Sequence, residues 1–197
     1  AWTSDNSDAV ERQKIQYGTS MCYPLSSMGS HVSVVPNHQV NRVTPLHTRA
    51  NTAYFGTFGY ELDLGKLNAE EIAEVKDEIA FMKEYREIFQ FGTFYRLQSP
   101  FEHNVMAWMC VSGDQKTAIV GWYRTLNRVN DRFTRVRLAG LLPDTLYEDS
   151  RSGARCYGDE LMHYGLITTD GTTGEPHPED GLTTDFDSRL YVLNAVE

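Results

Sequence analysis

The first ninety residues alternate between stretches with helical hydrophobic spacing and short apolar runs that are typical of strands. Helices are predicted where apolar residues recur every three or four positions, and strands where β-branched or alternating residues cluster. Such alternation predicts parallel strands joined by crossover helices, which is an α/β arrangement. The predicted helices cover residues 9–17, 44–55 and 68–90, and the predicted strands cover 32–35 and 60–64.

The ends of these helices carry local signals. Gly18 is predicted to end the first helix, and Thr44 to cap the second, with Pro45 in its first position. In the longest helix, Asn68 is the predicted N-cap and Glu71 the returning acid of a capping box. This helix is amphipathic and suited to packing on a sheet. Its apolar stripe comprises Ile72, Val75, Ile79 and Met82, and its predicted solvated face includes Glu74, Lys76, Asp77 and Glu78.

After Gly92 the hydrophobic period changes from helical to two-fold. Many short alternating segments separated by turn residues predict an antiparallel β-sandwich over 92–197, following the α/β part over 1–91. Gly113 and Asp114 mark a hairpin turn. A stretch rich in Gly, Pro, Thr and acidic residues predicts a mobile loop over 168–187. The predicted strands cover 94–98, 105–112, 117–126, 132–141 and 189–196, with weaker ones at 155–157 and 161–164.

Composition and charge narrow the class of protein. The chain has 197 residues, of which 41% are hydrophobic and 12% aromatic, enough for a packed core. Its net charge of −9 argues against nucleic acid and against an anionic membrane surface as partners. No apolar run is long enough to span a membrane. Three sparse cysteines favour a reducing compartment, so we expect a cytoplasmic protein.

The sequence holds no common metal-binding motif. His31, His38 and His47 are spaced by seven and nine residues, which no common zinc motif uses, so no metal site is expected. Glu61 and Asp63 share one predicted strand face, where acids are more often solvated or barrel-wall residues than a catalytic pair. For His31 and His38, packing in a loop is weighed slightly above contact with a substrate or its neighbours.

An acidic and polar cluster precedes the first predicted helix. It comprises Ser4, Asp5, Asn6, Ser7 and Asp8. One interpretation is helix capping, because such side chains satisfy the free N–H groups of a first turn. The other is catalysis, because carboxylates at the ends of barrel strands do acid–base chemistry. Spacing alone favours capping.

Several rare strings, in one order, resemble the α-galactosidases of glycoside hydrolase family 36. They are WTSDNSDAVERQKIQYGTS, YPLSSMGSHVSVVPNHQVNRVTPLHTR, FGYELDL and YREIFQFGTFYRL, and the likeness fades after about Gly165. The resemblance implies that residues 1–91 are the C-terminal part of a (β/α)8 TIM barrel, beginning at the end of its sixth strand, and that 92–197 form the C-terminal antiparallel β-sandwich. It also implies that the chain is the C-terminal portion of a longer enzyme.

The resemblance further implies a retaining hydrolase that removes terminal α-galactosyl residues from oligosaccharides of the melibiose and raffinose type. In the family's S-D-N motif the first Asp is the acid/base, which is Asp5 here. Trp2, Ser4 and Asn6 are then predicted to bind substrate, without a metal or organic cofactor. The family's nucleophile lies in a lysine-tryptophan-aspartate string that this sequence lacks. The chain alone is therefore expected to be inactive.

Two other partners and one rival function follow from the same residues. A partial barrel predicts contact with the remaining N-terminal part of the enzyme, and exposed sheet edges and apolar faces predict a homo-oligomer. The rival is a carbohydrate-binding or assembly module without catalysis of its own. Such a module would need exposed aromatic residues, and Trp108, Trp122 and Tyr123 are the candidates. Trp108 lies in an alternating apolar run, so a place in the core is favoured for it.

Overall fold

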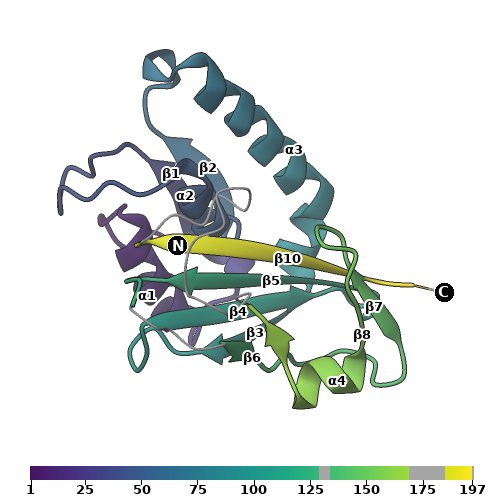
Figure 1. Ribbon diagram of the computed structural model, residues 1–197. Helices are drawn as coiled ribbons and strands as arrows, with labels where there is room; N and C mark the ends of the chain where they lie inside the picture. The colour runs from purple at the N-terminus through teal and green to yellow at the C-terminus, as the bar shows by residue number, and fades with distance from the viewer. Residues whose placement is uncertain (129–133, 169–184, 197) are drawn as a thin grey trace. The chain divides into compact units, whose positions relative to one another are not determined.

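The computed structural model describes residues 1–128, 134–168 and 185–196 (Figure 1). The chain forms two compact units, Ala1–Phe91 and Gly92–Glu197, and each is described by itself. In the first unit, helices alternate with two parallel strands. Its elements are α1 (Ala9–Thr19), β1 (Gly29–Ser33), α2 (Leu46–Ala53), β2 (Thr57–Glu61) and α3 (Ala69–Phe91), with 3-10 turns at Leu25–Ser27 and Leu64–Lys66.

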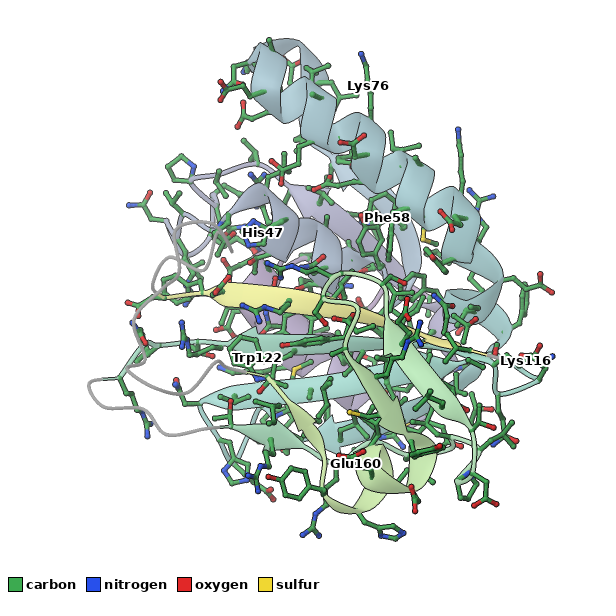
Figure 2. All side chains as sticks on the ribbon, turned by 45° about the vertical axis from the view of Figure 1, so that its right-hand side comes forward. His47, Phe58, Lys76, Lys116, Trp122 and Glu160 are labelled. Atoms are coloured by element: carbon green, nitrogen blue, oxygen red, sulfur yellow. The ribbon has the colours of Figure 1, made fainter. Side chains whose placement is uncertain are left out.

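Strands β1 and β2 pair in parallel from Gly29 opposite Thr57 to Ser33 opposite Glu61. Alternate side chains point to opposite faces of these strands. On one face, Phe58 stacks on Tyr54 at the end of α2, with ring centroids 4.9 Å apart. Figure 2 shows Phe58 between β2 and α3, whereas Lys76 projects from α3 into solvent. The helices therefore cover one face of the strand pair.

The predicted helices are present, and their ends differ in detail from the predictions. Asn68 caps α3 by accepting from Glu71 N at 2.9 Å, while Glu71 accepts from Asn68 N at 2.9 Å, so the predicted capping box is confirmed. Thr44 was predicted as a cap but is not one, because α2 begins at Leu46 with Pro45 at its N-cap and no side-chain cap bond. Helix α1 continues past Gly18 to Thr19.

The strands of the first unit lie a few residues earlier than predicted. β1 ends at Ser33, and Val34 is 45% exposed beyond it, before the cis peptide bond between Val35 and Pro36. The predicted shared strand face of Glu61 and Asp63 is wrong. β2 ends at Glu61, and Asp63 caps the following 3-10 turn by accepting from Gly65 N at 3.0 Å.

One burial prediction in the first unit is also wrong. Glu78 was assigned to the solvated face of α3, yet it is 6% exposed. It lies on the same helical face as Val75 and Met82, and Tyr60 on β2 donates to its Oε2 atom at 2.6 Å. On β1, Val32 is fully buried.

The second unit is antiparallel, as predicted. A six-stranded sheet has the order β3-β4-β5-β10-β7-β8, and a two-stranded sheet pairs β6 with β9. The only helix among its described residues is α4, which has six residues. The elements are β3 (Thr93–Gln98), β4 (Val105–Val111), β5 (Thr117–Arg124), β6 (Arg135–Val136), β7 (Leu146–Asp149), β8 (Arg155–Tyr157), α4 (Gly158–His163), β9 (Leu166–Ile167) and β10 (Asp187–Ala195).

The core of this unit lies between the six-stranded sheet and a second layer made by β6, β9 and α4 (Figure 1). Trp122, Met109 and Tyr191 come from the sheet, and Val136 and Leu161 from the second layer. Alternating residues of β4 and β5 supply the sheet side, as their two-fold pattern predicted. The predicted sandwich is confirmed, with a second layer much smaller than the first.

Trp108, Trp122 and Tyr123 are core residues, as favoured for Trp108. Each is at most 1% exposed, and Trp108 Nε1 donates to Tyr123 Oη at 3.0 Å. A sugar-stacking platform built from these three residues is therefore excluded. The strand predicted at 161–164 is wrong, because these residues form the end of α4 and its C-cap. Among its described residues, the strand predicted over 132–141 is limited to β6, and β7 was not predicted. Most of the loop predicted over 168–187 lies outside the described residues.

Candidate functional site

The first eight residues run beside the start of β1 and lead into α1. Gly29 N donates to Ala1 O at 3.0 Å, and Thr3 Oγ1 lies 3.5 Å from Gly29 O. At the other end of β1, Ser33 Oγ donates to Ser7 O at 2.8 Å. The segment is therefore tied to both ends of the strand.

Asp8 is the cap of α1. Its Oδ2 atom accepts from Glu11 N at 3.1 Å, it is 1% exposed, and it forms an ion pair with Arg42. The capping interpretation of the acidic cluster thus applies to Asp8. Asp5 lies before the helix with its side chain exposed, and Trp2 Nε1 donates to its Oδ1 atom at 2.7 Å. No capping bond of α1 requires Asp5, which leaves its carboxylate available at the surface.

Ser4 and Asn6 shape the backbone on both sides of Asp5. Ser4 Oγ accepts from Asn6 N at 3.1 Å, and Asn6 Oδ1 accepts from Asp8 N at 3.0 Å. Short polar side chains commonly form such local turns. Ser4 and Asn6, two of the three residues predicted to bind substrate, therefore hold the turn that presents Asp5.

A small pocket opens beside this turn, next to β1, the end of β2 and α1. It brings together Trp2, Ser4 and Asn6, the predicted substrate-binding residues, and the Trp2 ring lies 6.1 Å from the His31 ring. Asp5 is at its margin, bonded to Trp2. The pocket is lined by Trp2, Thr3, Ser4, Asn6, Ser7, Arg12, Gly29, His31 and Glu61.

Arg12 is the charged group beneath the pocket, and the sequence analysis did not find it. It is 5% exposed, and its guanidinium donates to Gly29 O. Burial lowers the pKa of Arg12, while the negative charge of Glu61 opposes that change. Glu61, at the end of β2, also lines the pocket, although it was interpreted from the sequence as a solvated or barrel-wall residue. A buried Arg on a helix resembles a surface Arg in sequence, so no local signal marks it.

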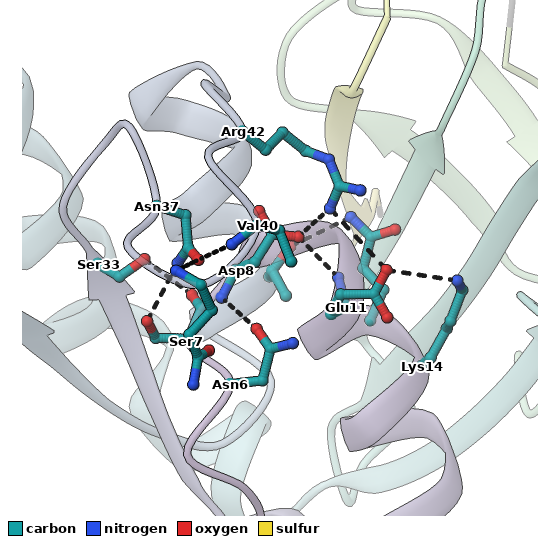
Figure 3. Close-up of polar contacts among 12 residues, drawn as sticks. Asn6, Ser7, Asp8, Glu11, Lys14, Ser33, Asn37, Val40 and Arg42 are labelled. Carbon is teal, nitrogen blue, oxygen red and sulfur yellow. Dashed lines mark hydrogen bonds and ion pairs between the residues drawn. The ribbon is translucent and has the colours of Figure 1, made fainter.

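The loop between β1 and α2 holds the polar segment from the other side, as Figure 3 shows. Asn37 Nδ2 donates to Ser7 Oγ at 3.2 Å, and Arg42 reaches the carboxylate of Asp8. Glu11 lies 3.9 Å from Arg42 and 3.6 Å from Lys14. Sequence reasoning missed Asn37 and Arg42, because loop residues show no periodicity and these contacts span about thirty positions.

Of the two histidines weighed between loop packing and substrate contact, His31 lines the pocket and His38 is not among its lining residues. His38 is exposed in the same loop. In the described part of the chain, no group of three or more His, Cys, Asp or Glu residues is arranged to hold a metal ion. Its helices are also too short or too polar to cross a membrane. Of the cysteines, Cys110 is buried as a small apolar residue would be, whereas Cys22 is exposed.

Both units match models of known families. The model described as Melibiase matches residues 1–92, which include the Asp5 turn and all of α3. The model of the glycosyl hydrolase family 36 C-terminal domain matches residues 105–193. Between them the two matches reach most of the chain.

Individual relatives extend the similarity. The chain is 48% identical over 196 residues to alpha-galactosidase AgaA of Geobacillus stearothermophilus. This alignment covers 100% of this chain and 25% of the relative. It is 47% identical over 165 residues to the bifunctional alpha-galactosidase/sucrose kinase AgaSK of Mediterraneibacter gnavus, covering 84% of this chain and 18% of the relative. The chain thus spans about a quarter or less of the length of these relatives.

Solved structures agree with these matches. A crystal structure of an AgaA variant from Geobacillus stearothermophilus in complex with raffinose has a TM-score of 0.89 and 47% identity, covering 98% of this chain and 25% of that structure. Another variant, in complex with stachyose, has a TM-score of 0.88, 48% identity and the same coverage. Because fold and sequence agree along both units, the chain belongs to glycoside hydrolase family 36.

Proposed function

We propose that this chain carries the acid/base part of a retaining α-galactosidase site, with Asp5 as the proton donor. The observation that supports the proposal most directly is that the carboxylates of Asp5 and Asp8 lie in different environments. Asp8 is buried, caps α1 and pairs with Arg42, whereas Asp5 is exposed at the margin of a polar pocket. A general acid must reach the oxygen that it protonates, and of these two Asp5 is the one that can.

The chemistry requires two carboxyl groups about 5–5.5 Å apart. The proton of Asp5 passes to the glycosidic oxygen as the bond to the galactosyl carbon breaks, while a carboxylate on the opposite side forms the glycosyl–enzyme ester. Asp5, now ionised, takes a proton from water, whose oxygen attacks the same carbon and releases galactose. Asp8 cannot be the second carboxylate, because it is 1% exposed and held by Glu11 N and Arg42. We propose that the nucleophile comes from a part of the enzyme outside this chain.

The substrate class follows the relatives. Those named here are α-galactosidases, and two AgaA structures hold raffinose and stachyose. We propose oligosaccharides with a terminal α-galactosyl group, with Trp2, Ser4 and Asn6 facing the sugar. Trp2 is 65% exposed and beside His31, so its ring face is open to a ligand.

The remainder of the enzyme is the proposed protein partner. β1 and β2 form a sheet of two strands, whereas a closed barrel of this type needs eight. Phe91 is 76% exposed and Val34 45%, which also favours self-association, and light scattering of the purified enzyme tests that. A cytoplasmic location is proposed because all three cysteines are free thiols.

The acid/base assignment is tested by Asp5→Asn in the full-length enzyme that carries this chain. General acid catalysis contributes about 10²–10⁴-fold, so kcat/KM for raffinose is expected to fall at least about a hundredfold. An activated aryl α-galactoside needs less protonation and should lose less. Azide should partly restore turnover of that substrate, because an anion attacks the intermediate without a general base.

The matched control is Asp63→Asn, which removes an exposed carboxylate from the same unit and leaves an amide oxygen for Gly65 N. It is expected to leave both activities unchanged. Near wild-type raffinose hydrolysis by Asp5→Asn would show that Asp5 is not the acid/base.

A further inference from the structure

The turn that presents Asp5 is held by a second segment, the loop between β1 and α2. This loop has no helix or strand of its own over residues 34–45, yet two of its side chains reach the turn. Figure 3 shows the contacts of these side chains with the turn, from Asn37 to Ser7 and from Arg42 to Asp8. These contacts give the loop a route to Asp5 through Ser7 and Asp8.

Asn37 gives this loop a fixed shape. Its Oδ1 atom accepts from Gln39 N at 2.9 Å and from Val40 N at 3.2 Å, while its backbone N donates to Arg42 O at 2.8 Å. The side chain is 2% exposed, and its amide nitrogen is left to donate to Ser7 Oγ at 3.2 Å. An amide serves both ends at once, because it accepts through oxygen and donates through nitrogen. Asn37 thus joins the closed loop to the turn.

Arg42 makes the second connection. Its guanidinium pairs with the Asp8 carboxylate, whose side chain is 1% exposed, and lies 3.9 Å from Glu11. A charged pair with one member buried is held in a narrow geometry, since moving either partner leaves the buried charge uncompensated. The same carboxylate oxygen accepts from Glu11 N, so Arg42 fixes the point where the turn enters α1.

Ser7 is therefore held at two atoms, and Asp8 at its carboxylate. Ser33 Oγ binds the carbonyl of Ser7, and Asn37 binds its hydroxyl. The turn is closed on itself by the bonds from Asn6 N to Ser4 Oγ and from Asp8 N to Asn6 Oδ1. A rotation of Ser7 or Asp8 would be transmitted to Asp5 by this short segment.

We infer that Asn37 and Arg42 are positioning residues that set the place of the Asp5 carboxylate through Ser7 and Asp8, an inference that rests on the proposed acid/base role of Asp5. Misplacing a reacting group by about 1 Å can cost about a hundredfold in rate. Loss of this hold should therefore impair proton transfer to the leaving group more than it impairs the formation of folded enzyme.

Two substitutions in the full-length enzyme remove one connection each. Arg42→Gln removes the cation from Asp8, and Arg42→Lys restores a charge without the guanidinium fork. Ser7→Ala removes the hydroxyl that Asn37 binds and keeps the carbonyl that Ser33 binds. Ser7→Ala is the milder change, so the inference remains testable if Arg42→Gln fails to fold. Lys66→Gln is the control, because it removes an equal charge from an exposed side chain of the same unit.

The diagnostic quantity is kcat/KM for raffinose divided by kcat/KM for an activated aryl α-galactoside. A structural defect lowers the amount of active enzyme and leaves this ratio unchanged. Poor positioning of the acid lowers the ratio, because raffinose has the poorer leaving group. We expect a fall of about tenfold for Arg42→Gln and severalfold for Ser7→Ala, partial recovery with Arg42→Lys, and no change for Lys66→Gln.

The Asp5→Asn background separates the two proposals. There the ratio should already be low, and adding Arg42→Gln should not lower it further, because both changes remove the same proton transfer. An unchanged ratio in folded Arg42→Gln and Ser7→Ala, with a lowered ratio in Asp5→Asn, overturns the positioning role alone. A normal ratio in Asp5→Asn overturns the proposed function itself.

Discussion

Glu78 is a buried acid on α3. Because burial changes its protonation, the stability of the first unit is expected to depend on pH. Its side chain is 6% exposed, Tyr60 donates to its Oε2 atom at 2.6 Å, and its Oε1 atom is buried with no hydrogen-bond partner in the described structure. Burial raises the pKa of Glu78 to about 7, with Glu74 adding to the rise and Tyr60, Arg49 and His47 opposing it. The carboxyl is therefore half-protonated near neutral pH.

The direction and size of the effect follow from proton linkage. In the unfolded chain the pKa returns to about 4.5, so between 4.5 and 7 the folded protein keeps a proton that the unfolded chain releases. The stabilising contribution is complete below pH 4.5 and is lost as the pH rises through 7. At about 1.4 kcal/mol per unit, a difference of about 2.5 units corresponds to a loss of about 3 kcal/mol.

The substitution Glu78→Gln removes this titration and keeps an oxygen that can accept from Tyr60. Between pH 5 and pH 8, the unfolding free energy of the wild type should fall relative to that of the variant by about 2–3 kcal/mol. The assay is urea unfolding followed by far-ultraviolet circular dichroism, to which α1, α2 and α3 of the first unit contribute most.

Comparing wild type with variant at each pH cancels the titration of every other group. Glu87→Gln, on an exposed position of the same helix, is the control and should show no such pH-dependent difference. An equal stability difference between wild type and Glu78→Gln at pH 5 and pH 8 would show that Glu78 does not retain a proton in the folded protein.

Two further predictions concern stability. Asn68→Ala removes the oxygen that accepts from Glu71 N at 2.9 Å, and should lower the unfolding free energy by about 1 kcal/mol in the same urea assay. Asn68→Asp keeps an oxygen that can accept from Glu71 N, so its unfolding free energy should stay near that of the wild type. Gly158→Ala would place a Cβ atom 2.0 Å from Leu142 O, so the backbone must shift at a cost of about 1–3 kcal/mol. Gly113→Ala meets nothing within 4 Å, and an equal loss there would contradict this explanation.

The features that local sequence predicted well are those set by neighbours in the chain. The capping box at Asn68 needs only Glu71, three residues away, and the structure shows it as predicted. The change of period after Gly92 likewise located β4 and β5, because side chains project alternately to the two faces of a strand whatever it packs against. The family resemblance rested on short strings, and the family models confirm it.

The features that local sequence missed depend on contacts between distant segments. By its spacing, Glu78 belongs to the buried face of α3 with Val75 and Met82. Its charge nevertheless led to a prediction of solvent exposure, because the hydrogen bond from Tyr60 on β2 was not foreseen. Charge alone predicts exposure only where no partner can compensate burial. The partner came from a strand 18 positions earlier, which periodicity within the helix cannot reveal.

The sequence by itself determined the helices of the first unit, most strands and the family, because periodicity, caps and motifs depend on residues that are close together in the chain. It also marked Asp5 and Asp8 as candidates for capping or catalysis, without deciding which acid caps the helix. Only the tertiary structure separated them, since Arg42, 34 positions beyond Asp8, pairs with it and leaves Asp5 at the surface. The physical reason is that charge pairing and burial depend on proximity in space, which folding creates between residues that are far apart in the chain.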